Sequence, residues 1–213
     1  MQIRWLGHAS FMITSAAGVR IITDPYQTSE TVKYGDIDEP ADVVTISHEH
    51  GDHNHAAAVR GNPEIIRSSA AVSGIDFKSI ATCHDDARGQ QRGKNTVFCF
   101  EVDGIRVCHL GDLGHFPDDN QVVEMGEVDV LLIPVGGNYT IDAAVAIKLC
   151  DRLTPRVVIP MHYKTDKLDY PVSGVDEFLK DKEDVVRMPA AEVKFEAGEL
   201  PAPTRIVVLQ SAR

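Results

Sequence analysis

Apolar runs of strand length alternate with turn residues through the first part of the chain. Ile3–Thr14 leads through a turn at Ser15–Gly18 into Val19–Thr23, which is the pattern of a β-hairpin. The second run stops at Asp24 and Pro25, because a proline cannot donate a hydrogen bond to a neighbouring strand. The pattern therefore predicts a hairpin whose second strand ends in an aspartate.

A more continuous apolar run leads directly into a histidine-rich segment. Asp42–Ser47 lacks the alternation of a half-exposed strand, so we predict a strand that is buried on both faces. Four histidines and an aspartate lie in TISHEHGDHNH, residues 45–55, at the carboxyl end of this strand. Next, His55–Arg60 followed by Gly61 has the pattern of a short helix and its C-cap.

The middle of the chain repeats the pattern of the first hairpin. Val97–Val102, a turn at Asp103 and Gly104, and Ile105–Leu110 form a second predicted hairpin, which ends at Asp112. The segments ITSAAGVRIITDP and FEVDGIRVCHLGD share the order strand, glycine-containing turn, strand, aspartate. This weak internal similarity suggests two similar halves.

Strands and helices alternate in the rest of the chain. In order, we predict a strand at Val128–Pro134, a helix capped by Thr140, a strand at Arg156–Pro160, a helix beginning at Ser173 with Asp176 in a capping-box position, and strands at Val193–Phe195 and Arg205–Leu209. Ile141, Val145 and Leu149 fall on one face of the first helix. Because hairpins and strand–helix–strand units both occur, we expect one α/β domain over residues 1–213, with two packed sheets and helices outside.

Composition and charge narrow the classes of partner. The chain has 213 residues, of which 43% are hydrophobic, enough for the core of one ordinary globular domain. Its net charge of -11 repels polyanions, so we expect no nucleic-acid partner. The four cysteines lie far apart, as is typical of reduced thiols in a cytosolic protein. The N-terminus lacks the pattern of a signal peptide, and no apolar stretch approaches the roughly 20 residues of a membrane span. We therefore expect a cytoplasmic protein that does not enter a membrane.

The histidine-rich segment has the residue types of a metal site, although a solvated loop that happens to be rich in histidine is the simpler alternative. Neutral imidazole and carboxylate are natural ligands for zinc-like ions. Residues i and i+2 at a strand end point the same way, so His48 and His50 can bind one ion. Asp52 and His53, in the turn that follows, can reach a second ion roughly 3.5–4 Å away, and such a pair can share a hydroxide.

The motif H-x-H-x-D-H after a buried strand resembles the metallo-β-lactamase superfamily. The segments WLGHASF near the N-terminus, LGDLGH at residues 110–115 and IPMHYKT at residues 159–165 resemble its ascorbate-6-phosphate-lactonase-like branch of small hydrolases. The resemblance extends from Trp5 to Lys164. It implies a four-layer αββα sandwich, with two mixed sheets, helices on the outer faces, and a site along the sheet edge where strand-end loops gather.

The resemblance also implies three further ligands, each in a loop after a strand. Asp112 matches a carboxylate that bridges two ions, and His162 matches the last ligand of the second ion. The remaining ligand is a histidine between the cluster and Asp112, either His84 or His109. His84 opens a loop, whereas His109 sits inside a strand and out of alternation with Asp112, so His84 is preferred. The predicted set is His48, His50 and His84 for one ion, Asp52, His53 and His162 for the other, and Asp112 shared by both.

Such a centre implies a metal-dependent hydrolase. Two divalent ions, with Zn²⁺ as the default and Mn²⁺ or Fe²⁺ open, would lower the pKa of bound water toward about 7 and supply a bridging hydroxide. Asp52 would orient that hydroxide and Asp112 would bridge the ions, so these are the predicted catalytic carboxylates. The branch favours a small anionic substrate, either a lactone or ester or a phosphodiester.

Five residues are candidates for substrate binding. Arg88 and Arg92 lie in a short positively charged segment that suits an anion, although a solvated turn is the alternative. Asn138 follows two glycines before a helix, where backbone N–H groups can hold an anion. His115 lies close enough to Asp112 to reach a cleft, and Tyr163 is a potential donor to a leaving group.

Two other histidines and one aspartate are weaker candidates for a role in the site. We expect His8 to be a hydrogen-bonded core histidine, with a supporting or substrate-contacting role as the alternative, and His55 to lie on a helix surface. Asp24 is expected to cap a turn or support a ligand.

Three other functions remain open. An RNA-processing metallo-nuclease uses the same fold, but the negative charge disfavours it. A non-catalytic metal-binding protein on the same fold would be expected to have lost ligands. Redox chemistry on a di-iron centre usually replaces a cluster histidine by a carboxylate at the position of His50. The sequence leaves the oligomeric state open, a homo-oligomer included.

Overall fold

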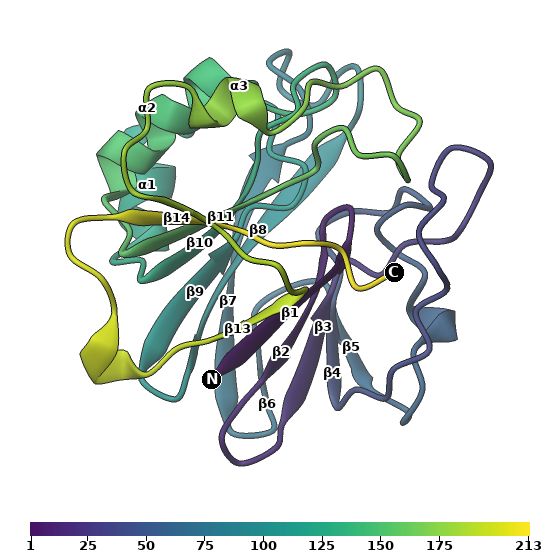
Figure 1. Cartoon of the computed structure of the whole chain (residues 1–213). Coiled ribbons are helices and arrows are strands. Elements are labelled where there is room, and N and C mark those ends of the chain that lie inside the picture. The colour runs from purple at the N-terminus through teal and green to yellow at the C-terminus, as the bar shows by residue number, and fades with distance from the viewer.

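A computed structural model of the whole chain, Met1–Arg213, contains two mixed β-sheets packed against each other (Figure 1). The order of the six-stranded sheet is β13 (Glu192–Lys194), β1 (Gln2–Gly7), β2 (Ser10–Thr14), β3 (Arg20–Thr23), β4 (Val43–Thr45) and β5 (Glu64–Ile66). The order of the eight-stranded sheet is β12 (Val185–Arg187), β14 (Arg205–Val208), β11 (Val157–Met161), β10 (Val130–Pro134), β9 (Ile105–His109), β8 (Lys94–Val102), β7 (Ile75–Cys83) and β6 (Ala70–Val72). This architecture confirms the predicted two-sheet α/β sandwich.

The first predicted hairpin is a three-stranded meander, because the run Ile3–Thr14 reverses in its middle. β1 ends at Gly7, and β2 returns antiparallel to it from Ser10. Gly7 has φ +133°, and a Cβ there would lie 2.5 Å from the Tyr34 ring, so this reversal requires glycine. The prediction of one continuous strand was wrong, since a glycine within an apolar run permits a sharp turn.

Three helices lie on the outer face of the eight-stranded sheet (Figure 1): α1 (Asp119–Met125), α2 (Ala143–Leu153) and α3 (Asp176–Leu179). The N-cap of α2 is Asp142, whose carboxylate accepts a hydrogen bond from Val145 N at 2.9 Å, and not Thr140 as predicted. α3 begins at Asp176 rather than at Ser173 and has no side-chain cap. None of the helices combines the length and the apolar character that a membrane crossing requires.

Loops, and not helices, cover the outer face of the six-stranded sheet. The segment of residues 26–41 folds over that face, and His55–Arg60 forms only a short 3-10 turn, η1 (Ala56–Ala58), in place of the predicted helix. Buried aromatic side chains such as Tyr26 and Tyr34 pack there against Leu6. The expected helical layer is therefore absent on this side, because large aromatic residues in a loop bury the sheet instead.

The core between the sheets follows the alternation of the strands. Ile21 joins the main cluster of 45 buried residues, whereas its neighbour Ile22 joins the smaller cluster beneath the covering loop. β10 and β11 are buried along their whole length, as expected for parallel strands covered on both faces. A further short turn, η2 (Ala197–Glu199), connects β13 to β14.

Strand directions bring several loops to one edge of the sandwich. β1, β3 and β4 share one direction in the first sheet, because β2 is antiparallel to both β1 and β3 and β4 is parallel to β3. β7, β9, β10 and β11 share one direction in the second sheet. The loops after these carboxyl ends carry the polar cluster described next.

Candidate metal centre

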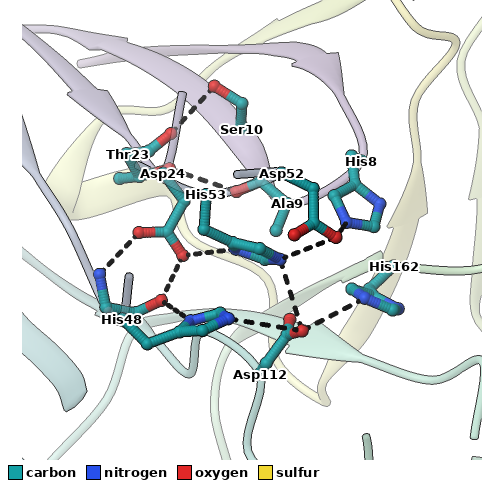
Figure 2. Close-up of polar contacts among 12 residues, drawn as sticks. His8, Ala9, Ser10, Thr23, Asp24, His48, Asp52, His53, Asp112 and His162 are labelled. Atoms are coloured by element: carbon teal, nitrogen blue, oxygen red, sulfur yellow. Dashed lines mark hydrogen bonds and ion pairs between the residues drawn. The ribbon is translucent and has the colours of Figure 1, made fainter. Parts of the chain in front are cut away.

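Asp112 lies at the centre of the polar cluster, in the loop after β9 (Figure 2). Its Oδ2 is 3.2 Å from Nε2 of His84, 3.3 Å from Nε2 of His53 and 3.3 Å from Nε2 of His162. Nε2 of His48 is 3.9 Å away. One carboxylate thus faces imidazoles from four separate positions of the chain, in both sheets.

Three groups of side chains have metal-ligand spacing, and one of them, Asp24, His48 and His53, shares a histidine with each of the other two. His48, His50 and His84 form one group, in which the potential ligand atoms all lie within 4.8 Å of one another. His8, Asp52, His53 and His162 form the other group, within the same limit. The structure therefore brings together all seven residues of the predicted ligand set, with the predicted division between the two groups, and adds His8 to the second.

Asp24 orients two of the histidines, His53 and His48, through their Nδ1 atoms (Figure 2). Its Oδ2 accepts hydrogen bonds from His53 Nδ1 at 3.0 Å and from Ser47 Oγ at 2.5 Å, and its Oδ1 accepts one from Ser47 N at 2.7 Å. Ser47 Oγ in turn contacts His48 Nδ1 at 2.9 Å. With Nδ1 of His53 donating to Asp24, its Nε2 is left to face Asp112, which is how outer carboxylates orient metal-binding histidines.

Gly111 and Asn95 hold Asp112 in place. Gly111 has φ +54°, and a Cβ there would lie 2.5 Å from the Cβ of Ser47, so no larger residue fits between β9 and the first sheet. Asn95 Oδ1 accepts a hydrogen bond from the backbone N–H of Asp112 at 2.9 Å. Asn95 Nδ2 donates to Leu110 O at 3.0 Å, so this buried amide fixes both sides of the turn.

The structure distinguishes between the two candidate histidines of the first group. Both ring nitrogens of His109 bind backbone: Nε2 donates to Ala9 O at 2.8 Å, and Nδ1 accepts from Gly111 N at 3.2 Å. His84 follows the last residue of β7 and turns its Nε2 toward Asp112. His84, and not His109, therefore completes the first group.

Asp52 has two hydrogen-bond donors on one oxygen. Its Oδ2 accepts from Nε2 of His8 at 3.2 Å and from the hydroxyl of Tyr170 at 3.1 Å. His8 is fully buried in the turn between β1 and β2, at φ +52°. The expectation that His8 is a hydrogen-bonded core histidine agrees with this position, but its partner is a candidate ligand.

Burial and the neighbouring charges shift the pKa values in the cluster. Burial, and then the charge of His53, lower the pKa of His48 to about 3. Burial also lowers the pKa of His8, to about 4. The pKa of His53 is raised well above its ordinary value, because the Asp112 and Asp52 carboxylates outweigh the effect of burial. Burial opposes ionisation of Asp112, yet His162 and His53 hold its pKa well below the usual range. Asp112 is thus held ionised and His48 and His8 neutral, which are the protonation states in which carboxylate and imidazole bind a metal.

The buried nitrogen and oxygen atoms of the cluster are suitable ligands for a divalent transition metal. Nε2 of His48 and Oδ1 of Asp112 are buried and have no hydrogen-bond partner, and Nε2 of His53 has only its ion-pair contact with Asp112. Leaving such an atom unpaired costs about 1–3 kcal/mol, so a fold that leaves several at one point needs a compensating interaction. Imidazole nitrogens and carboxylate oxygens are ligands that zinc, manganese and iron accept.

A cavity of about 330 Å³ opens onto the cluster. It is lined by His50, Asp52, His84, Gln91, Arg92, Asp112, Tyr139, His162 and Tyr170. Arg92 lies on the loop after β7, and its guanidinium carbon is 5.1 Å from the centre of the Tyr139 ring. The backbone N–H groups of Gln91 and Arg92 both donate to the buried carboxylate of Asp85, which holds the loop against the cavity.

Four predicted substrate-binding residues do not line the cavity. Arg88 and Asn138 are exposed on the outside of their loops. His115 accepts from Cys83 N through Nε2 and donates to Phe116 O through Nδ1, so the backbone occupies both ring nitrogens. Tyr163 is buried against Trp5, with ring centres 5.4 Å apart. The structure does not place these four side chains at the cavity, because closeness in sequence to a ligand does not fix the direction of a side chain.

Gln91, Tyr139 and Tyr170 line the cavity but were not predicted. Tyr170 lies in a loop eight residues after His162, and no spacing in the sequence connects it to Asp52. Tyr139 ends the stretch Gly136–Tyr139 in which an anion site was expected, but only Asn138 was named there as a candidate. Side chains that enter a site from separate loops leave no local pattern.

Comparison with known proteins places these features in a family. Residues 2–162 match the family described as Beta-lactamase superfamily domain. A UPF0173 metal-dependent hydrolase from Thermococcus onnurineus is 30% identical over 91% of this chain and 98% of its own length. A crystal structure of a putative Zn-dependent hydrolase of the metallo-β-lactamase superfamily from Thermotoga maritima is 40% identical, covers 98% of this chain and 97% of its own, and superposes with a TM-score of 0.81. The short form of human tRNase Z shares the fold alone, with 10% identity, a TM-score of 0.55, and coverage of 78% of this chain and 93% of its own.

Proposed function

Since the chain belongs to the beta-lactamase superfamily, within its UPF0173 group of metal-dependent hydrolases, we propose that it hydrolyses a small anionic substrate with two divalent ions held around Asp112. The observation that carries the proposal is the position of Asp112 Oδ2, 3.2–3.3 Å from three imidazoles that belong to two different ligand groups. A carboxylate between two ligand groups suits a pair of ions that share it.

In this proposal the residues of the cluster hold the two ions and orient the attacking water. His48, His50 and His84 would hold one ion, and Asp52, His53 and His162 the other, with Asp112 common to both. The ions, when bound, would supply Lewis acidity and a water nucleophile at neutral pH. Zn²⁺ is the default, and Mn²⁺ or Fe²⁺ suit the same donors. Asp52, held by its two donors, would orient the attacking water.

The cavity supports a small anionic substrate. Its volume of about 330 Å³ lies at the lower end of the range for small-molecule sites. Arg92 is the one cationic side chain other than histidine in its lining and would bind a phosphate or carboxylate group of the substrate. A lactone, an ester or a phosphodiester with such a group fits. The net charge of -11 disfavours RNA, and the free cysteines favour action in the cytoplasm.

Metal analysis combined with a substrate panel tests this function. Elemental analysis of the purified protein should give close to two transition-metal ions per chain. Turnover of a panel of phosphodiesters, esters and lactones should collapse in Asp112→Ala and His162→Ala. His55→Ala is the matched control, because His55 lies in the same histidine-rich segment but outside both ligand groups and outside the cavity lining. Turnover that survives complete loss of metal would refute the proposal.

A further inference from the structure

Hydrolysis of an ester or a phosphodiester places negative charge on an oxygen of the substrate, and a preorganised hydrogen-bond donor near the reacting centre stabilises that charge. Tyr163, the donor that the sequence suggested, does not line the cavity, and neither does His115. Four lining residues remain once the candidate ligands are set aside: Gln91, Arg92, Tyr139 and Tyr170.

Tyr170 is the one of these four that contacts a candidate metal ligand. Its hydroxyl lies 3.1 Å from Asp52 Oδ2, and its ring centre is 6.5 Å from that of His162. Arg92 stacks over Tyr139, and Tyr139 packs edge-on against Tyr170 with ring centres 5.4 Å apart. The Tyr139 ring therefore separates the Arg92 guanidinium from Tyr170 and the candidate ligands. At that position the guanidinium can bind an anionic group of the substrate that is distant from the reacting oxygen.

Asp52 does not depend on Tyr170 for its orientation. The same Oδ2 also accepts a hydrogen bond from His8 Nε2 at 3.2 Å. His8 is fully buried and outside the cavity lining, so it cannot leave Asp52 for a substrate. Tyr170 borders the cavity and can change partner while His8 keeps the carboxylate in place.

The backbone on either side of Tyr170 is anchored, so only its side chain has to move. Asp169 N donates to Thr31 O at 2.7 Å before Tyr170, and Ser173 N donates to Gly136 O at 2.8 Å after it. Leu168 is buried in the core beneath the covering loop. A rigid backbone with one rotating hydroxyl limits the conformational entropy that is lost when a substrate binds.

We propose that Tyr170 is a catalytic residue whose hydroxyl moves from Asp52 to the substrate oxygen that becomes negative in the reaction. The inference rests on the proposed function and names a donor that neither the sequence nor the family comparison indicates. It assigns Asp52 a permanent partner in His8 and a temporary partner in Tyr170. Arg92 is left to bind an anionic group away from the reacting bond.

Tyr170→Phe tests the proposal, because it removes one oxygen atom and keeps the ring. The wild-type protein and the variant are loaded with Zn²⁺, their metal content is measured, and binding of inorganic phosphate, a tetrahedral oxyanion, is followed by calorimetry. We expect unchanged metal content, about tenfold or more weaker phosphate binding, and kcat about 10²–10³-fold lower on the panel substrates. Tyr163→Phe is the matched control, since Tyr163 follows a ligand directly but points away from the cavity.

Two results would overturn the proposal. Phosphate binding and kcat equal to those of the wild type would show that the hydroxyl does not contact the oxyanion. Loss of metal in Tyr170→Phe would show that its role is to position Asp52. If the proposed function is wrong, the metal-loaded wild type will turn over no panel substrate. The comparison of phosphate binding between wild type and Tyr170→Phe then still tests whether Tyr170 contacts a bound oxyanion.

Discussion

Exchanging each of the two alternative histidines, His84 and His109, for leucine separates a structural role from a ligand role. His109 and His84 are both buried, at the carboxyl ends of β9 and β7 in the same sheet, but their ring nitrogens have different partners. His109→Leu keeps a similar volume and removes a donor to Ala9 O and an acceptor for Gly111 N. Ala9 O would keep only the longer contact with Thr23 Oγ1, at 3.3 Å.

The magnitude follows from those two contacts. An orphaned buried backbone group costs about 1–3 kcal/mol, so His109→Leu should lower the free energy of unfolding of the metal-free protein by about 2–4 kcal/mol. His84 leaves no backbone group unpaired, its Nδ1 already lacks a partner, and Asp112 keeps His53 and His162. His84→Leu should therefore change the stability of the metal-free protein by less than about 1 kcal/mol.

Urea unfolding of the chelated proteins and elemental analysis of the loaded proteins give the two readouts. We expect His109→Leu to be less stable but to keep the wild-type metal content whenever it is folded. We expect His84→Leu to be stable but to lose about one ion per chain. The opposite pattern, with metal lost in His109→Leu and retained in His84→Leu, would refute the assignment of the first ligand group.

Three further perturbations test other parts of the structure. Asp24→Asn should weaken metal affinity about 10–100-fold in competition with a chelator, since Asp24 orients His53; unchanged affinity would contradict this role. Removing metal present at 100 times its dissociation constant should cost about 2.7 kcal/mol, and so lower the melting temperature by about 5–10 °C in calorimetry; an unchanged melting temperature would count against a folded-state metal site. Burial opposes ionisation of Asp129, but hydrogen bonds from Arg106 hold its pKa below the ordinary value. Because the folded-state pKa is below that of the unfolded chain, this contribution is present above about pH 4 and is lost as the pH falls. Asp129→Asn should thus be about 1–2 kcal/mol less stable than wild type at pH 7 in urea unfolding, with the difference shrinking at pH 3; a constant difference would contradict the charge-dependent contribution.

Local patterns in the sequence were sufficient for much of the fold. The second hairpin appears as β8 and β9, and the buried runs appear as β4, β10 and β11, because strands covered on both faces leave continuous apolar runs. β7 alternates between buried and exposed residues and could also have been predicted from its sequence. α1 begins with a capping box at Asp118 and Gln121, so its start could also have been predicted from the sequence.

The positions of the predicted ligands also have a local cause. Each follows the carboxyl end of a strand, and strands of one direction bring those ends to one edge of the sandwich. The resemblance to a known superfamily added Asp112 and His162, which no spacing connects to His48. The roles of Asp112 and His162 as metal ligands stay predictions, but the fold does place both residues next to the histidine cluster.

The sequence by itself determined the carboxyl ends of β4, β9 and β11 to within two residues, the H-x-H-x-D-H segment and the acidic charge, since each depends on residues that are neighbours in the chain. Only the tertiary structure decided between His84 and His109, because the choice depends on the carbonyl of Ala9, 100 residues away from His109. It also decided that Tyr163 faces the core while Tyr170 faces the cavity. The direction of a side chain is set by contacts between distant segments, and these leave no periodic pattern in the sequence.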